Sequence, residues 1–313
     1  MVPPPYPLIG RLLREGKVVP FLGAGVNVRS PEAAADPDAG PALPTGSELS
    51  RRLAREVAYP SEDDRDLTDL AKVASYFVEI SARERLCETL REEFTVEARP
   101  SPMHRYLASV DAPLMIVTTN YDDLMERAFI EAGRPYDLVV HPTDQREVEG
   151  SVLWWAHGAT APEAVAPNKL YIELDQRTVI YKMHGSICRA SEKLDSYVVT
   201  EEDYVDFLAR MTGQHAVPAQ FLHHFRRCHF LYLGYGLRDW NLRVMLRMLR
   251  VSGAGMGKGG SGSGDDDDRR LVSWAVQYRP SPIETELWGT RDVKIYDVLI
   301  DDFVRALSKG RGA

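Results

Sequence analysis

Residues 17–27 read Lys17-Val18-Val19-Pro20-Phe21-Leu22-Gly23-Ala24-Gly25-Val26-Asn27, a hydrophobic run that ends in a glycine-rich turn. A short apolar run bounded by glycine is typical of a buried strand. The same pattern occurs three more times along the chain. The polar motifs that end these runs are Thr118-Thr119-Asn120-Tyr121-Asp122, Lys182-Met183-His184-Gly185-Ser186 and Leu233-Gly234-Tyr235-Gly236-Leu237-Arg238-Asp239-Trp240-Asn241. Loops at the carboxyl ends of parallel strands meet at one crevice, so the sequence predicts a nucleotide site with a reactive centre.

Strand-like runs alternate with helical patterns, which predicts an α/β fold with a mostly parallel sheet flanked by helices. Strands are expected at Lys17–Leu22, Leu114–Val117, Arg177–Tyr181, His229–Leu233, Leu271–Gln277 and Val293–Val298. Residues 45–110 show only helical patterning and predict an insertion, after the first glycine loop, that covers one side of the sheet. Thr45 and Glu48 have capping-box spacing at its start. We expect one domain over residues 1–313, with a flexible Gly/Ser/Asp loop at 252–268.

Composition and charge exclude several classes of protein. The formal net charge of −8 over 313 residues argues against a chain-wide surface for nucleic acid. Three widely separated cysteines and no CxxC pair fit a reducing cytosol and exclude a four-cysteine zinc site. The sequence has no signal-peptide pattern and no run of 18 apolar residues. We therefore expect a cytoplasmic protein that does not bind membranes.

The first motif, Gly23-Ala24-Gly25, is half of a dinucleotide fingerprint, because glycine lets the backbone approach a pyrophosphate. The third glycine of GxGxxG is missing, since Val28 stands there. A plain tight turn is therefore an equally good interpretation. No acidic residue follows at the end of a second strand, where a dehydrogenase would hold its ribose. This absence argues against an ordinary NAD dehydrogenase.

The second and third motifs carry the residues suited to catalysis. Asn120 stands at a strand end, where its amide would hydrogen-bond to a ribose or a water; the alternative is a turn residue that assists Asp122 as a helix N-cap. His184 stands at another strand end beside a glycine and would act as a general base near neutral pH. His157, in a His157-Gly158 pair, is a competing candidate in a poorer setting. No histidine has companion acids at metal-ligand spacing, so we expect no metal.

The fourth motif offers two glycines and then two polar residues that open a helix. Asp239 and Asn241 would hold a phosphate or ribose at the helix N-terminus, although Asp239 as a simple N-cap is compatible with the same pattern. Thr119, which precedes Asn120, is grouped with the predicted nucleotide contacts. Asn27 joins the same group because its amide can hydrogen-bond.

Taken in order, the four motifs resemble those of the sirtuin-like superfamily, and most closely its bacterial branch in antiviral defence. The resemblance extends from about Val18 to Val298 and implies a Rossmann-like sheet. It implies a phosphate loop at Gly23, Ala24 and Gly25, and a second dinucleotide loop at Gly234, Tyr235 and Gly236. It also implies that Asn120 and Asp122 lie near the nicotinamide and its ribose, and that His184 is the catalytic histidine.

The departures from the family pattern are as informative as the matches. The Asp-Phe-Arg element of deacylating sirtuins is absent after Pro44, and the zinc-binding cysteine quartet is absent too. Both differences argue against protein deacylation. Asn27 and Gly236 stand where serine is common in the family, so the detailed contacts to NAD differ.

The resemblance implies an NAD+ hydrolase that releases nicotinamide and ADP-ribose and depletes NAD during antiphage defence. Such an enzyme needs restraint, so we expect a homo-oligomer or control by a partner, for example a translocase ATPase or another defence protein. The main alternative is a non-catalytic subunit that binds NAD or ADP-ribose. ADP-ribosyl transfer or deacylation is the weaker alternative.

Overall fold

The structure is a computed structural model, and it describes residues 3–29, 40–143, 148, 150–212, 217–235 and 271–309. Within these ranges, no helix is both long enough and apolar enough to cross a membrane. The predicted loop at 252–268 and the predicted contacts Gly236, Asp239 and Asn241 lie outside the described residues.

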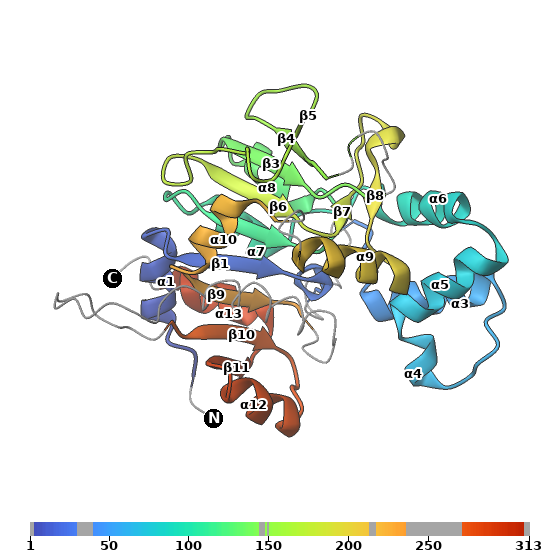
Figure 1. Ribbon diagram of the computed structural model, residues 1–313. Helices are drawn as coiled ribbons and strands as arrows, with labels where there is room; N and C mark the ends of the chain where they lie inside the picture. The colour runs from blue at the N-terminus through green and yellow to red at the C-terminus, as the bar shows by residue number, and fades with distance from the viewer. Residues whose placement is uncertain are drawn as a thin grey trace, which may run out of the picture.

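Nine strands of the described residues form one sheet (Figure 1), in the order β11-β10-β9-β1-β2-β6-β3-β4-β5. Their bounds are β1 Val18–Leu22, β2 Met115–Thr118, β3 Tyr136–Val140, β4 Val152–Trp155, β5 Glu163–Val165, β6 Thr178–Lys182, β9 His229–Leu233, β10 Ser273–Gln277 and β11 Val293–Asp297. The ladder is parallel from β11 to β3, and β4 and β5 add two antiparallel strands at one edge. The predicted Rossmann-like α/β fold is confirmed.

Helices cover both faces of the sheet, because each presents an apolar stripe to it. One face packs against α1 (Tyr6–Arg14), α7 (Pro102–Ala108), α8 (Leu124–Glu131) and α13 (Ile300–Lys309). The other packs against α9 (Glu201–Thr212), α10 (Ala219–Phe225) and α12 (Pro282–Gly289). The central strands β1 and β6 are buried at every position, which is why their middle residues read as continuous hydrophobic runs rather than alternating ones.

The helical insertion forms, but its predicted position was wrong. Its helices are α3 (Gly46–Glu56), α4 (Asp64–Leu67), α5 (Leu70–Ile80) and α6 (Arg83–Phe94), followed by α7. Only α7 lies on a face of the sheet. The others build a separate core with residues of the site loops, among them Tyr121, Ile187 and Tyr197. They therefore lie beyond the carboxyl ends of the strands (Figure 1), beside the predicted site.

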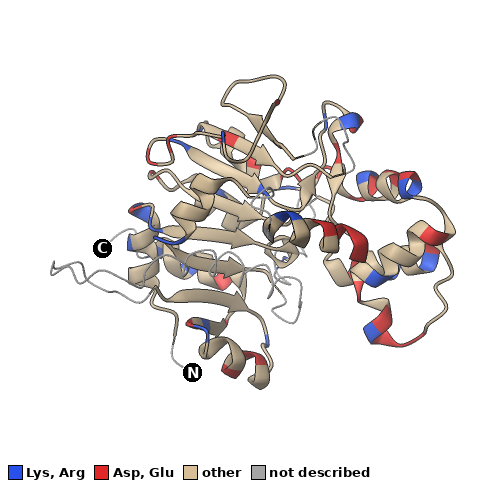
Figure 2. Ribbon diagram, viewed as in Figure 1, with Lys and Arg blue, Asp and Glu red and all other residues tan. Residues whose placement is uncertain are grey.

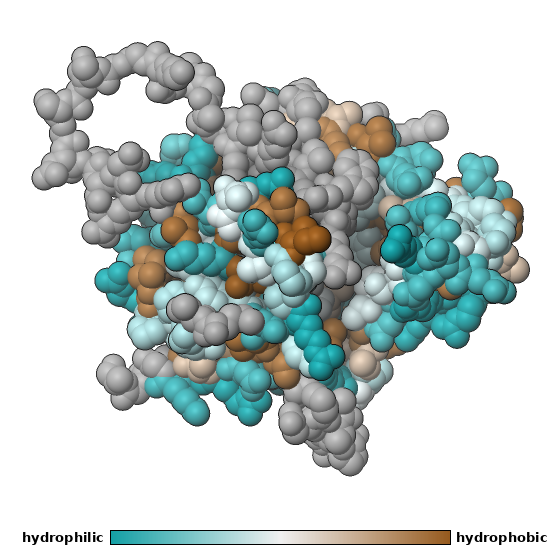
Figure 3. Space-filling model, turned by 90° about the horizontal axis from the view of Figure 1, so that it is seen from below, coloured by the Kyte–Doolittle hydropathy of each residue, from teal (hydrophilic) through white to brown (hydrophobic). Residues whose placement is uncertain are grey.

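Local sequence signals explain where the insertion begins and why its surface is hydrophilic. Thr45 and Glu48 form the predicted capping box, in which the Glu48 carboxylate accepts the Thr45 N–H at 2.8 Å. Figure 2 shows Lys and Arg residues interleaved with Asp and Glu on these helices. In Figure 3, which is viewed from the side of α12, the insertion is mostly hydrophilic, whereas hydrophobic residues gather near the middle of that face. Ile283 and Leu287 of α12 are exposed hydrophobic residues.

Two small strands complete the setting of the site. They are β7 (Gly185–Ser186) and β8 (Ser196–Tyr197), which pair as an antiparallel hairpin. Gly185 has φ +85°, and a Cβ there would lie 2.1 Å from the carbonyl oxygen of Ser196. The glycine that follows His184 is therefore required by the backbone, independently of any ligand.

Candidate active site

The four predicted loops leave the sheet side by side. Strands β9, β1, β2 and β6 are consecutive in the sheet, and Leu22 pairs in register with both Leu233 and Thr118. Thr118 in turn pairs with Lys182. The loops after these residues therefore start at the same level, at the carboxyl ends of neighbouring strands, as the strand-end pattern predicts.

The first and fourth loops touch each other through glycine backbone. The Gly25 N–H donates to the carbonyl of Gly234 at 2.9 Å. Gly234 has φ +74°, and a Cβ there would lie 2.2 Å from the Val26 nitrogen, while a Cβ on Gly25 would lie 2.7 Å from the Gly234 oxygen. These two glycines are thus required for packing loop on loop. No backbone hydrogen bond from the Ala24 N–H to the described residues is found, so this group is a candidate for an anion contact.

Tyr235 connects three of the loops. Its hydroxyl lies 2.7 Å from Thr119 Oγ1 and donates to the carbonyl of Leu22 at 3.0 Å. Its ring packs on Phe21 with a centroid separation of 5.3 Å, and a Cβ on Gly23 would lie 3.1 Å from that ring. The hydroxyls of Thr119 and Tyr235, two predicted cofactor contacts, bond to each other and hold the loops in place.

Asn27 and Asp122 join the first loop to the second. The Asn27 amide Nδ2 donates to Asp122 Oδ2 at 2.9 Å, and both side chains are buried. Asn27 Oδ1 is buried and has no hydrogen-bond partner among the described residues. An orphaned buried acceptor is costly, which makes Asn27 Oδ1 a candidate atom for a ligand contact.

The predicted N-cap role of Asp122 needs correction. The N-cap residue of α8 is Asp123, whose side chain makes no capping bond. Asp122 still performs the capping function from one residue earlier, because its Oδ1 accepts the Leu124 N–H at 3.0 Å. Its carboxylate is therefore anchored at both oxygens, by Leu124 and by Asn27.

Asn120 and His184 stand at neighbouring strand ends, each two residues beyond the register pair Thr118 and Lys182. Asn120 is nine-tenths buried, and its Nδ2 donates to the carbonyl of Gly23 at 3.3 Å. This bond connects the candidate catalytic amide to the first glycine loop. The turn interpretation of Asn120 is part of the same geometry, since its N–H donates to Thr118 Oγ1 at 3.0 Å.

His184 is buried against α9, where its ring packs edge-on against Tyr204 and Phe207. Burial, together with the neighbouring His141, lowers the pKa of His184 to about 3. The imidazole is therefore neutral over the whole ordinary pH range. His184 stays the predicted general base near neutral pH, now as a neutral imidazole. Its burial could not be read from the motif, because Tyr204 and Phe207 lie twenty or more positions away in the sequence.

A cavity of about 300 Å³ opens beside the two glycine loops. It is lined by Gly25, Gly234 and Tyr235 and also by residues outside the four motifs, including Gln277 and Ile300. Gln277 Oε1 is buried with no hydrogen-bond partner among the described residues. The signal was present in the sequence, because Gln277 ends the predicted strand Leu271–Gln277 and the strand-end rule applies to it equally.

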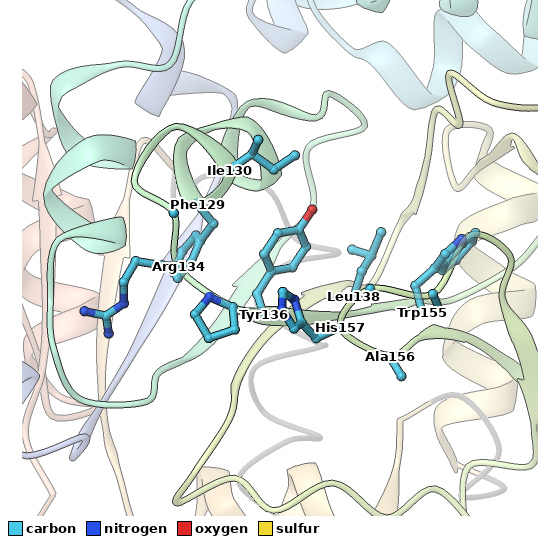
Figure 4. A pocket seen from close by; sticks show the side chains of 12 residues that line it. Phe129, Ile130, Arg134, Tyr136, Leu138, Trp155, Ala156 and His157 are labelled. Atoms are coloured by element: carbon cyan, nitrogen blue, oxygen red, sulfur yellow. The ribbon is translucent and has the colours of Figure 1, made fainter.

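The competing histidine lies elsewhere. His157 and Gly158 line a different cavity of about 540 Å³, with Tyr136, Leu138 and Trp155 around it (Figure 4). Tyr136 begins β3, so this cavity lies at the amino ends of the parallel strands, whereas the four loops lie at their carboxyl ends. The His157 interpretation is thus separated from every other candidate. Among the described residues, no group of three or more His, Cys, Asp or Glu side chains is arranged to hold a metal ion.

Comparison with known proteins identifies the family of this chain. The model of the SIR2-like domain matches residues 114–290, which include the second, third and fourth motifs. The chain belongs to the SIR2-like family. The match begins beyond the first glycine loop, so the SIR2-like assignment of Gly23–Gly25 depends on the contacts described above.

Curated relatives of this SIR2-like chain include two proteins named NAD(+) hydrolase ThsA. That of Cytobacillus dafuensis is 28% identical over 245 residues, covering 77% of this chain and 40% of the relative. That of Acinetobacter baumannii (strain 532279) is 27% identical over 219 residues, covering 68% of this chain and 38% of the relative. Defense-associated sirtuin 2 of Bacillus subtilis is 21% identical over 239 residues, covering 76% and 20%. The chain thus spans about two fifths of the two hydrolases or less.

Proposed function

We propose that this SIR2-like chain is an NAD+ hydrolase that releases nicotinamide and ADP-ribose. The observation that carries the proposal is the convergence of Asn120, Asp122 and His184 with two glycine loops at the ends of four adjacent strands. The names of the two curated relatives support the same chemistry. Residues 1–313 would act as one NAD-binding unit, with the insertion as one wall of the site.

The chemistry suits a site with a neutral base. In NAD+ the nicotinamide ring is already cationic, so the bond to the ribose breaks with its electron pair going to the leaving ring, and little acid help is needed. The transition state places positive charge on the ribose. A protonated His184 would repel that charge, whereas the neutral ring accepts a hydrogen bond from a ribose hydroxyl or the attacking water. Water then forms the new bond, and its proton leaves through His184 or solvent.

Asn120 and Asp122 would supply orientation. Asn120 would position the water or a ribose hydroxyl through its amide, which is already connected to the first loop through Gly23. The Asp122 carboxylate would add negative charge near the oxocarbenium-like ribose. Loss of one such group typically costs on the order of 10²–10⁴ in rate.

The rest of the dinucleotide would extend along the glycine loops. The pyrophosphate would meet the Ala24 N–H, with Asn27 Oδ1 accepting from a ribose hydroxyl. The cavity beside Gly25 and Gly234 is large enough for an adenine ring, and Gln277 Oε1 would accept from its exocyclic amine. Gly236, Asp239 and Asn241 remain candidates for the same end of the ligand.

We further propose that the chain depletes NAD in antiphage defence, in the cytoplasm, and is controlled by self-assembly or by a partner protein. The name of the Bacillus subtilis relative supports the defence role. A hydrolase of this kind harms its own cell unless it is restrained, which is the physical reason to expect such control.

The direct test is to measure by chromatography how fast nicotinamide is released from NAD+ at several protein concentrations. Wild-type protein should release nicotinamide and ADP-ribose in equal amounts, with a rate per molecule that rises with concentration if assembly activates it. His184→Ala should lower the rate at least about 100-fold. His157→Ala is the matched control and should leave the rate unchanged, since His157 lines the cavity at the amino ends of the parallel strands.

Three outcomes would contradict the proposal. Full turnover in the His184→Ala variant would remove His184 from the mechanism. Tight NAD binding without nicotinamide release at any concentration would favour the alternative of a binding subunit. Labelling of a protein acceptor by NAD would instead favour ADP-ribosyl transfer.

A further inference from the structure

Lys182 is a fully buried lysine whose ammonium meets three acceptors. It donates to the carbonyl oxygen of Tyr121 at 3.4 Å, to Glu126 Oε1 at 2.9 Å and to the carbonyl oxygen of Asp122. An ammonium group has three N–H donors, so each donor has its own acceptor. The side chain of Lys182 is 0% exposed and that of Glu126 8%. A buried lysine with this arrangement is uncommon and needs an explanation.

The three acceptors and the lysine belong to different parts of the candidate site. Lys182 ends β6, two residues before His184. Tyr121 and Asp122 belong to the loop that carries Asn120, and Glu126 lies in the first turn of α8. One ammonium group therefore joins the strand that presents the histidine to the loop that presents the amide.

The contacts of Lys182 also reach the first glycine loop, through Asp122. Its backbone carbonyl is held by Lys182, while its carboxylate accepts from Asn27. Rotation of the Asp122 peptide would move that carboxylate away from Asn27. The backbone contact with Lys182 thus adds to the anchoring of the carboxylate by Asn27 and Leu124.

Glu126 is what makes a buried cation tolerable. A lone ammonium in the interior would carry a large desolvation cost, and the carboxylate supplies the opposing charge. Burial raises the pKa of Glu126, and Lys182 opposes that rise. Nearby His104 adds no second positive charge, because burial lowers its pKa to about 4.

We propose that the Lys182–Glu126 pair is a positioning device for the hydrolase site, acting through the carbonyls of Tyr121 and Asp122. It touches no substrate itself. The inference depends on the proposed NAD+ hydrolysis, and it assigns a function to the lysine of the third motif. Its signature is a loss of kcat with little change in KM, because misplacement of Asn120 and Asp122 affects the transition state more than ground-state binding.

The test separates positioning from stability with two variants. Lys182→Met should lower kcat about 100-fold, with KM changed by less than about threefold, and should also lower Tm because Glu126 is left unpaired. Lys182→Met combined with Glu126→Leu removes both charges, so Tm should return toward the wild-type value. Its kcat should stay low, because the two carbonyls remain unheld. Lys169→Met, at an exposed lysine, is the matched control and should change neither quantity.

Recovery of kcat in the double variant to within threefold of wild type would overturn the proposal, since the pair would then matter only for stability. Hydrogen exchange of the peptide covering residues 119–126 gives a second readout that needs no turnover. Exchange should be faster in the double variant than in wild type, and equal exchange would also overturn the proposal. If wild-type protein releases no nicotinamide, the hydrolase proposal fails, and the exchange experiment alone decides whether the pair holds the loop.

Discussion

Lowering the assay pH from 7.5 to 5 should leave NAD+ turnover by this chain almost unchanged. A histidine with the ordinary pKa of about 6.5 is only about 3% neutral at pH 5. A base of that kind would lose about thirtyfold in rate over this interval. His184 has a pKa lowered to about 3 by burial and by His141, so about 99% of it stays neutral at pH 5. The structure therefore predicts a rate change smaller than about twofold from this group.

The assay is kcat/KM for NAD+ from pH 5 to pH 8, because that ratio reports the ionisations of the free enzyme. Initial rates need a parallel measurement of folded protein at each pH by circular dichroism. The measurement also tests the environment of His184. Phe207→Ser would admit water beside the ring, so its profile should gain an inflection at a higher pH than the wild-type profile.

A thirtyfold decline in kcat/KM centred near pH 6.5, in protein that stays folded, would refute the reasoning. It would mean that His184 is hydrated in solution, and that a neutral buried base is the wrong description of the site. A flat profile in which His184→Ala is as active as wild type would refute the catalytic assignment instead. The two failures are therefore distinguishable.

Buried His104 and the backbone of Gly234 give two further predictions. The pKa of His104 is lowered by burial to about 4, so its stabilising contribution is complete above pH 6.5 and is lost as the pH falls toward 4. The free energy of unfolding in urea should fall by about 2 kcal/mol less between pH 7 and pH 5 in His104→Gln than in wild type, and equal losses would contradict this. Gly234→Ala should lower Tm more than Gly133→Ala does. Both glycines have positive φ, but only at Gly234 would the added Cβ lie within 3 Å of backbone atoms. The Gly234→Ala variant should also bind NAD at least about tenfold more weakly, as measured by calorimetry. Equal Tm changes in the two variants would show that the loop contact is not tight.

The central strands were predictable because burial on both faces leaves a mark in the sequence. Strands β1, β2, β6 and β9 read as unbroken apolar runs followed by glycine or polar residues. The edge strands β4 and β5 were missed because they are only partly buried and carry no such contrast. The insertion was recognised as helical but misplaced, because an amphipathic pattern shows which side of a helix is buried and not which partner buries it.

Lys182 illustrates what the sequence could not reveal about the site. At the end of an apolar run, a lysine reads as a solvated residue. Its burial depends on Glu126, 56 positions away, and on two carbonyls whose direction is set by the turn between β2 and α8. The low pKa of His184 has the same origin, since the residues that enclose it come from α9. Motif spacing identified these residues, and the packing of distant segments determined their chemistry.

The contrast between polar atoms that are hydrogen-bonded within the protein and polar atoms without a partner also indicates where a ligand would bind. The loops hold one another through Gly25 with Gly234, Tyr235 with Thr119, and Asn27 with Asp122, so these groups need no ligand to be ordered. Rigid loops lower the entropic cost of binding, because little remains to be ordered when NAD enters. Against that satisfied background, the orphaned acceptors Asn27 Oδ1 and Gln277 Oε1 stand out, since native proteins leave few buried polar atoms without partners. Both lie in parts of the site assigned to the ribose and the adenine, so removal of either acceptor should weaken binding of ADP-ribose as much as binding of NAD+.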